Sequence, residues 1–107
     1  MLTFFCKLNP PRLTFAADMT PEEGAVMQSH AEYWTEWTTR GHVVAFGLVG
    51  DPAGAYGIGI VEFENEAGVR GFTDRDPAIL SNRGFRYDVL PMPLGVAHRG
   101  ARSGGRD

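Results

Sequence analysis

The sequence predicts a small α+β domain with the element order β-α-β-β-α-β. Three observations predict it: four segments rich in β-branched and aromatic residues, one long amphipathic segment after the first of them, and a short helical segment before the last. This order is typical of the ferredoxin-like arrangement, an antiparallel sheet with both helices on one face. A chain of 107 residues is expected to form one domain, here assigned to residues 1–94.

The longest predicted helix runs from Thr20 to Gly41. Thr20 is a favourable N-cap, Pro21 suits the first helical position, and Glu23 completes a capping box. Gly41 can adopt the left-handed conformation that ends many helices. At 3.6 residues per turn, the residues that share the apolar face are Val26, Met27, His30, Tyr33, Trp34 and Trp37.

His30 lies near the centre of this apolar face, and two interpretations follow. A single histidine in such a position is commonly a hydrogen-bonded core residue. An imidazole can also exchange a proton with a ligand near neutral pH, which makes His30 a candidate catalytic residue. The helix by itself leaves both interpretations open.

The first strand is predicted over residues 2–8, which are rich in β-forming side chains. Cys6 is expected to be a small packing residue of this strand. Residues 9–19 are expected to form a loop, because Pro10 and Pro11 cannot continue a strand interior.

A β-hairpin is predicted after the long helix. Its strands are residues 42–49 and 56–64, and the turn residues Asp, Pro and Gly lie between them at 50–55. Gly47 lacks a side chain and leaves room for the close approach of a ligand.

The last part of the domain is predicted to hold a weak helix and a fourth strand. Asn65 is the expected N-cap of a helix over residues 66–73, and residues 78–83 add a further helical turn. The fourth strand is expected over 85–90, before two prolines. The Gly- and Arg-rich residues 95–107 are expected to be a disordered tail.

The predicted strands are apolar on both faces, which indicates a homodimer. In residues 42–49, strict alternation would place Val43, Ala45 and Val49 on one face and Val44, Phe46 and Leu48 on the other. Two helices can cover only one face, and the other would be an unusually large apolar patch for a monomer. A second sheet packed face to face would bury it, with about 1,600 Å² removed from water in total.

Composition excludes several classes of function. The net charge is −3, which argues against nucleic-acid binding. Cys6 is the single cysteine, so an intrachain disulfide is impossible and a cytoplasmic location is expected. We expect no secretory signal and no membrane span. We also expect no metal and no cofactor, because His30, His42 and Asp76 lack compact ligand spacing and no phosphate-binding motif is present.

Three segments, in this order and spacing, resemble a known family. They are HAEYW at residues 30–34, the hairpin segments 41–47 and 57–62, and Asp76-Pro77 followed by Gly84-Phe85. On these segments the chain resembles the YCII-related domain (YciI-like) family over residues 2–94. Leu48 departs from the proline that the family typically has after the hairpin glycine, and segment 76–84 is also atypical.

The resemblance implies a dimeric α+β barrel and a His–Asp pair, which falls on His30 and Asp76. Relatives with this barrel act on small ring-cleavage and aromatic-breakdown intermediates as isomerases, lyases or oxygenases. A carboxylate on one imidazole nitrogen would orient the ring and leave the other nitrogen for a substrate proton. Residues expected to wall the substrate cavity are Trp34, Trp37, Phe46 and Gly47.

Two hypotheses follow for the function. In the first, the protein is a cofactor-independent lyase or isomerase that moves a proton on a small organic acid or a ring-breakdown intermediate. In the second, it is a non-catalytic metabolite-binding or structural dimeric module, in which His30 is a satisfied core residue and Asp76 only caps the turn before Pro77.

Overall fold

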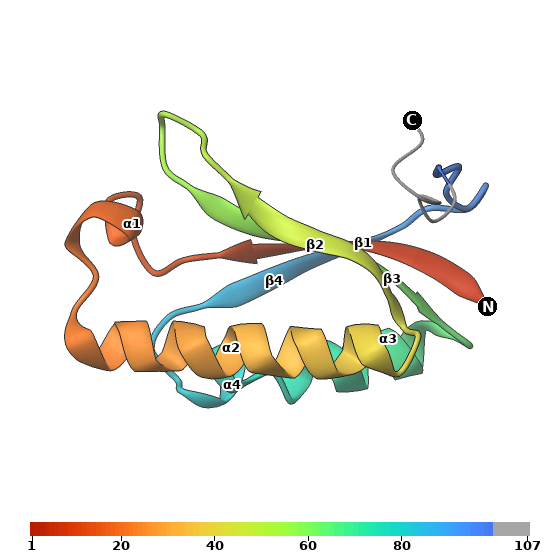
Figure 1. The fold of residues 1–107 in the computed structure, drawn as a ribbon, viewed down its shortest axis with the longest axis horizontal. Helices are drawn as coiled ribbons and strands as arrows, with labels where there is room; N and C mark the ends of the chain where they lie inside the picture. The colour runs from red at the N-terminus through yellow and green to blue at the C-terminus, as the bar shows by residue number, and fades with distance from the viewer. Residues whose placement is uncertain (100–107) are drawn as a thin grey trace, which may run out of the picture.

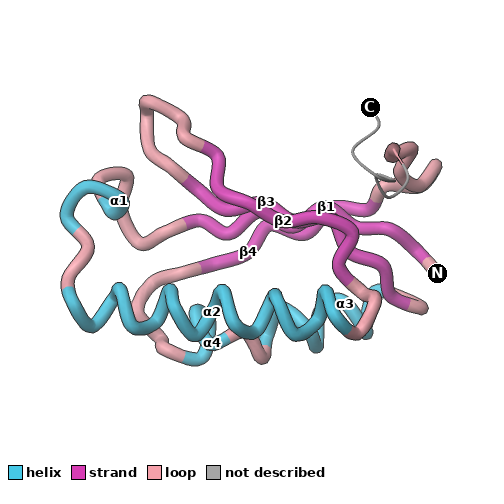
Figure 2. Tube along the Cα trace, viewed as in Figure 1, coloured by secondary structure: helices cyan, strands magenta, loops and turns pink. Residues whose placement is uncertain are grey.

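The computed structural model describes residues 1–99 and contains one four-stranded antiparallel sheet with the strand order β2-β3-β1-β4. Figure 1 shows α2, α3 and α4 on one face of this sheet, and Figure 2 shows the same two layers by element type. The elements are β1 (Leu2–Asn9), α1 (Phe15–Asp18), α2 (Pro21–Thr39), β2 (Val43–Val49), β3 (Tyr56–Phe63), α3 (Glu66–Asp74), α4 (Pro77–Leu80) and β4 (Arg86–Pro91). The predicted α+β, ferredoxin-like fold is confirmed.

Two predictions about helical segments differ from the structure. The segment predicted as a loop over 9–19 contains the one-turn helix α1, which lies at one end of the sheet (Figure 1). The helical turn expected over 78–83 is the shorter helix Pro77–Leu80. Of the predicted tail, residues 95–99 have no helix or strand, and the remainder lies outside the described residues.

The start of α2 is held by the predicted capping box and by an arginine from the preceding loop. The hydroxyl of Thr20 accepts a hydrogen bond from the Glu23 N–H at 3.2 Å, and the Glu23 carboxylate accepts one from the Thr20 N–H at 2.9 Å. Arg12 donates to both carboxylate oxygens of Glu23, each at 2.8 Å, and also to Asp18. Arg12 thereby ties α1 to α2, and its hydrogen bonds lower the pKa of Glu23 to about 2.

The main core lies between the sheet and the helices. It contains Phe4 and Cys6 of β1, Val61 and Phe63 of β3, Trp34 of α2, and Val69 and Phe72 of α3. A glycine in β3 is essential to this packing, because a Cβ at Gly59 would lie 2.2 Å from the Trp34 ring. Gly59 therefore has a packing role.

The strict alternation predicted for β2 is wrong, because a β-bulge interrupts the strand. Val43 pairs with Val61, whereas Phe46 pairs with Gly59, and the register shifts between residues 43 and 45. Val43 and Phe46 consequently lie on the same, helix-covered face, although they were predicted on opposite faces. The extra residue at the bulge reverses the side-chain alternation that follows it.

The opposite face of the sheet is covered by no helix within residues 1–99 (Figure 1). Register places Phe5 of β1, Ile58 and Ile60 of β3 and Leu90 of β4 on this face, which we call the open face. Leu90 is 57% exposed, and the other three are half-buried. No helix of the described chain is long and apolar enough to cross a membrane.

Candidate functional site

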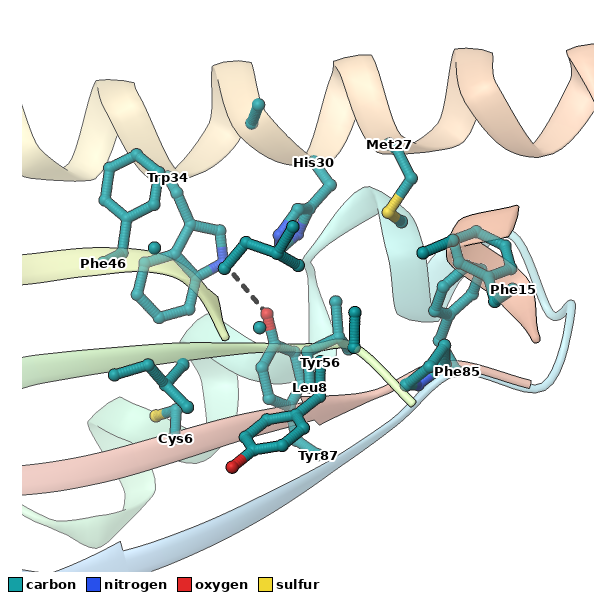
Figure 3. Close-up of a pocket in the computed structure, with 18 of the residues that line it drawn as sticks. Cys6, Leu8, Phe15, Met27, His30, Trp34, Phe46, Tyr56, Phe85 and Tyr87 are labelled. Carbon is teal, nitrogen blue, oxygen red and sulfur yellow. Dashed lines mark hydrogen bonds between the residues drawn. The ribbon is translucent and has the colours of Figure 1, made fainter. Parts of the chain in front are cut away.

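A cavity of about 430 Å³ lies between α2 and the sheet, next to α1. Small-molecule sites typically have volumes of about 300–1,000 Å³, so its size is suitable for a metabolite. Figure 3 shows the lining side chains, which come from the helices α1 and α2, from all four strands and from the loops between them. They include Leu8, Phe15, Met27, His30, Trp34, Phe46 and Tyr87.

The structure brings His30 and Asp76 together beside this cavity. His30 Nδ1 lies 2.8 Å from Asp76 Oδ2 and 3.1 Å from Oδ1. The Asp76 side chain is fully buried, whereas the His30 side chain is 18% exposed and lines the cavity. The carboxylate therefore lies behind the imidazole, on the side away from the open space.

Asp76 accepts hydrogen bonds from four groups: three side chains of α2 and β4, and one backbone N–H of α4. In addition to His30, its oxygens accept from Trp34 Nε1 at 2.9 Å, from the Ala78 N–H at 2.9 Å and from the Tyr87 hydroxyl. Burial raises the pKa of Asp76, but the hydrogen bonds from His30, Tyr87 and the Ala78 N–H outweigh it and hold the pKa below its ordinary value. Asp76 is accordingly an ionised, buried carboxylate.

Tyr87 and Trp34 complete this arrangement. Trp34 Nε1 lies 2.9 Å from the Tyr87 oxygen, the contact drawn in Figure 3. Burial and the neighbouring Asp76 charge raise the pKa of Tyr87, so its hydroxyl stays protonated and donates to the carboxylate. We call His30, Trp34 and Tyr87 around Asp76 the Asp76 cluster.

The ionised carboxylate determines which nitrogen of His30 carries the proton in the neutral ring. A carboxylate can only accept hydrogen bonds, so Nδ1 must donate, and the proton of the neutral imidazole lies on Nδ1. Nε2 then presents a lone pair. No other group within residues 1–99 forms a hydrogen bond with it. This nitrogen can accept a proton from a molecule in the cavity.

Local sequence explains how each of these groups is positioned. His30 and Trp34 are four residues apart on α2 and therefore project from the same face. Asp76 is the N-cap of α4, Pro77 occupies the first helical position, and the cap hydrogen bond goes to the Ala78 N–H. Asp76 thus caps the turn and binds His30 at the same time.

Three of the four residues predicted to wall the cavity do so, namely Trp34, Phe46 and Gly47. Trp37 is not among the residues that line this cavity. Its ring centroid lies 5.4 Å from that of Phe72 and 5.8 Å from that of Phe63, so it packs in the main core further along α2. Trp37 is nearly one turn beyond Trp34 and faces α3 instead of the cavity.

Sequence reasoning missed Tyr87, Met27 and Phe15 as lining residues. Met27 could have been found, because it shares the apolar face of α2 with His30. Tyr87 lies on the inward face of β4, opposite Leu8, and Phe85, which also lines the cavity, directly precedes this strand. Phe15 had no such signal, because it belongs to the segment predicted as a loop.

Two further observations limit the chemistry of the cavity. Burial raises the pKa of Cys6 to about 12, so the thiol is protonated and is a poor nucleophile. No group of three or more His, Cys, Asp and Glu side chains within residues 1–99 is arranged to hold a metal ion.

These features define a class: a single α+β domain of ferredoxin-like topology with a buried carboxylate and an imidazole at an apolar cavity. Comparison with known protein families matches residues 3–93 to the YCII-related domain. The chain belongs to this family, as its motifs predict. No curated protein matches the chain.

Proposed function

We propose that the protein is an enzyme that transfers a proton on a small organic acid or a ring-breakdown intermediate, as a lyase or isomerase does. One observation supports this most strongly. His30 Nδ1 is held by the buried carboxylate of Asp76, while the ring lines a cavity of about 430 Å³. A fixed imidazole with its second nitrogen toward a ligand is suited to general base catalysis.

In the proposed reaction, Nε2 of His30 takes a proton from a carbon or oxygen of the substrate. The imidazolium that forms is stabilised by the negative charge of Asp76. The same nitrogen then returns the proton to another atom of the substrate, and this step completes an isomerisation or expels a leaving group. Such chemistry needs no cofactor.

The experiment is a proton-exchange assay in deuterated water. A panel of ring-bearing ketones and 2-oxo acids is incubated with the protein, and loss of the acidic C–H signal is followed by NMR. His30→Gln should slow exchange by about 10²–10⁴-fold, the usual contribution of a general base. His42→Gln is the matched control, because His42 also forms a hydrogen bond through Nδ1, here to a backbone carbonyl, and does not line the cavity. Equal rates for wild type and His30→Gln on a substrate that the protein turns over would refute the proposal.

A second candidate is a non-catalytic binding or structural module, and the role of Asp76 as the N-cap of α4 favours it. In that case the contact between Asp76 and His30 serves the fold alone. Binding without exchange for every compound in the panel would favour this candidate. A thermal-shift screen finds the binders, because a bound ligand raises the unfolding temperature whatever the chemistry.

We also propose that the protein is a cytoplasmic homodimer. The half-buried Phe5, Ile58 and Ile60 on the open face, together with the exposed Leu90, support a second sheet packed against it. The single Cys6 thiol, which is buried and unpaired, suits a reducing compartment. Ile58→Lys should produce a monomer in sedimentation at micromolar concentration, whereas a wild-type protein that already sediments as a monomer would refute the dimer.

A further inference from the structure

The lining of the cavity contains no Asp, Glu, Lys or Arg side chain among the described residues. Its titratable side chains are Cys6, His30, Tyr56 and Tyr87, and none of them except the imidazole can supply a positive charge. The carboxylate of Asp76 lies directly behind that imidazole, with 2.8 Å between Nδ1 and Oδ2. The charge already present at the polar end of the cavity is therefore negative.

The helix α1 contributes Phe15 to the cavity wall, and Arg12 lies in the loop just before this helix. The guanidinium of Arg12 already binds two carboxylates. It donates to both oxygens of Glu23 and to the side chain of Asp18, at 2.8 Å in each case. A fourth hydrogen bond reaches the Asp18 carbonyl at 3.1 Å. Two carboxylates neutralise this cation, so it offers no free partner for an anionic ligand.

An anion in this cavity would lose its hydration without gaining a counter-charge of its own. Removing a carboxylate from water is costly unless it is paired and hydrogen-bonded. Its one possible partner is the protonated imidazole of His30, which Asp76 already shares. A neutral hydroxyl has no such difficulty, because it can donate directly to the lone pair of Nε2.

The remaining walls fit flat, apolar groups. Phe15 and Phe85 meet edge to face with 5.2 Å between ring centroids, and the Trp34 and Phe46 rings lie 5.7 Å apart at another wall. Leu8 and Met27 add aliphatic side chains to the cavity walls (Figure 3). Aromatic walls favour stacked or edge-on contact with a ring of the ligand.

We propose that the substrate is an uncharged, ring-bearing molecule whose hydroxyl or enol hydrogen-bonds to Nε2 of His30, in preference to a carboxylic acid. This inference narrows the substrate of the proposed proton transfer and depends on it for the role of Nε2. The O–H bond breaks, an N–H bond forms at Nε2, and the electron pair stays on the oxygen and spreads into the ring system. Return of the proton to a ring carbon gives the keto tautomer, and no oxidant or reductant takes part.

The test compares two probes of similar shape that differ in charge at neutral pH, 2-naphthol and 2-naphthoate. Binding is followed by NMR through the two indole N–H signals, because the sequence contains only two tryptophans. Trp34 lines the cavity and Trp37 does not, so the Trp37 signal is an internal control. We expect 2-naphthol to shift the Trp34 signal with a Kd at least tenfold lower than that of 2-naphthoate, while Trp37 is unchanged.

The inference is overturned if 2-naphthoate binds as tightly as 2-naphthol, or if 2-naphthol fails to shift the Trp34 signal. His30→Leu removes the acceptor nitrogen while it keeps an apolar wall, and it should weaken 2-naphthol binding at least tenfold. Unchanged binding by this variant would also overturn the inference. These outcomes are distinguishable from those of the exchange assay. Preference for the neutral probe without exchange supports an uncharged ligand at His30 and refutes its catalytic role. Exchange combined with preference for the anion supports the catalytic role and overturns the inference of an uncharged substrate.

Discussion

Two clusters beside α2 each contain a histidine, a tryptophan and a tyrosine, but they differ in what accepts the hydrogen bonds. In the Asp76 cluster the acceptor is a buried carboxylate. We call Tyr33, Trp37 and His42 the Trp37 cluster, and its acceptors are backbone carbonyls. His42 Nδ1 lies 2.8 Å from the carbonyl oxygen of Glu62, and the Tyr33 hydroxyl donates to the carbonyl oxygen of Phe72 at 2.7 Å.

The difference shows how similar residues can have different uses. His42 stacks on Phe63 with 4.5 Å between ring centroids and meets Trp37 edge-on at 5.2 Å, so its ring packs against two aromatic side chains. The other histidine faces a cavity and has an anion behind it. A histidine's residue type and half-buried state are therefore insufficient to indicate a site. The charge of its acceptor and the space at its second nitrogen distinguish the two clusters.

The largest expected effect is on proton exchange. Asp76→Asn should slow exchange by at least tenfold, because the amide carries no negative charge to stabilise the imidazolium of His30. In the Trp37 cluster the acceptor of the histidine is the backbone carbonyl of Glu62, which a side-chain substitution cannot remove. His42→Gln therefore provides the comparison. The rate per folded molecule is measured by NMR in deuterated water. A wild-type rate in Asp76→Asn would show that the carboxylate has no part in the transfer.

The same substitution should also reduce stability by about 2–3 kcal/mol, because a buried donor replaces an acceptor shared by several donors. An asparagine can still cap α4, which limits the loss. The free energy of unfolding is measured with urea. Asp74→Asn is the control, since Asp74 is exposed and its replacement should change stability by less than about 0.5 kcal/mol. Equal effects at the two positions would contradict the special role of Asp76.

Two tyrosine substitutions compare a charged acceptor with a neutral one. Tyr87→Phe removes a hydrogen bond to a carboxylate and should cost about 1.5–3 kcal/mol, whereas Tyr33→Phe removes one to a carbonyl and should cost about 0.5–1.5 kcal/mol. Urea unfolding of both variants gives the difference. The reverse order of losses would mean that the carboxylate is no stronger an acceptor than the backbone in this protein.

The smallest expected effect is on stability in acid. The folded-state pKa of Asp76 lies below its ordinary value of 3.8, so its contribution is fully present above pH 3.8 and is lost as the pH falls through the folded-state pKa. Glu23 titrates in the same direction and adds its own loss. Urea unfolding at a series of acidic pH values should show a shallower decline for Asp76→Asn than for wild type. Parallel curves for the two proteins would indicate that Asp76 has the same pKa in the folded and the unfolded state.

The sequence by itself determined the order of the four strands and of the helices α2 and α3, and the boundaries of α2. These features depend on neighbours in the chain: Thr20 and Glu23 form their capping box three residues apart, and the turn residues between β2 and β3 specify the hairpin. His30 was a candidate from its place on the helix. Its pairing with Asp76 was expected only from the resemblance to a family, because no local signal links residues 46 positions apart.

Only the tertiary structure decided which side chains face the cavity. The hydrogen bond between Trp34 and Tyr87 joins residues 53 positions apart, and the separation of Trp37 from the cavity depends on where α3 packs. The bulge in β2 moved Phe46 to the cavity side, and the hydrogen bonds of Arg12 hold the short helix α1 beside it. Helix capping and side-chain periodicity act over a few residues and can be recognised in sequence, whereas these contacts form only when sheet and helices pack together.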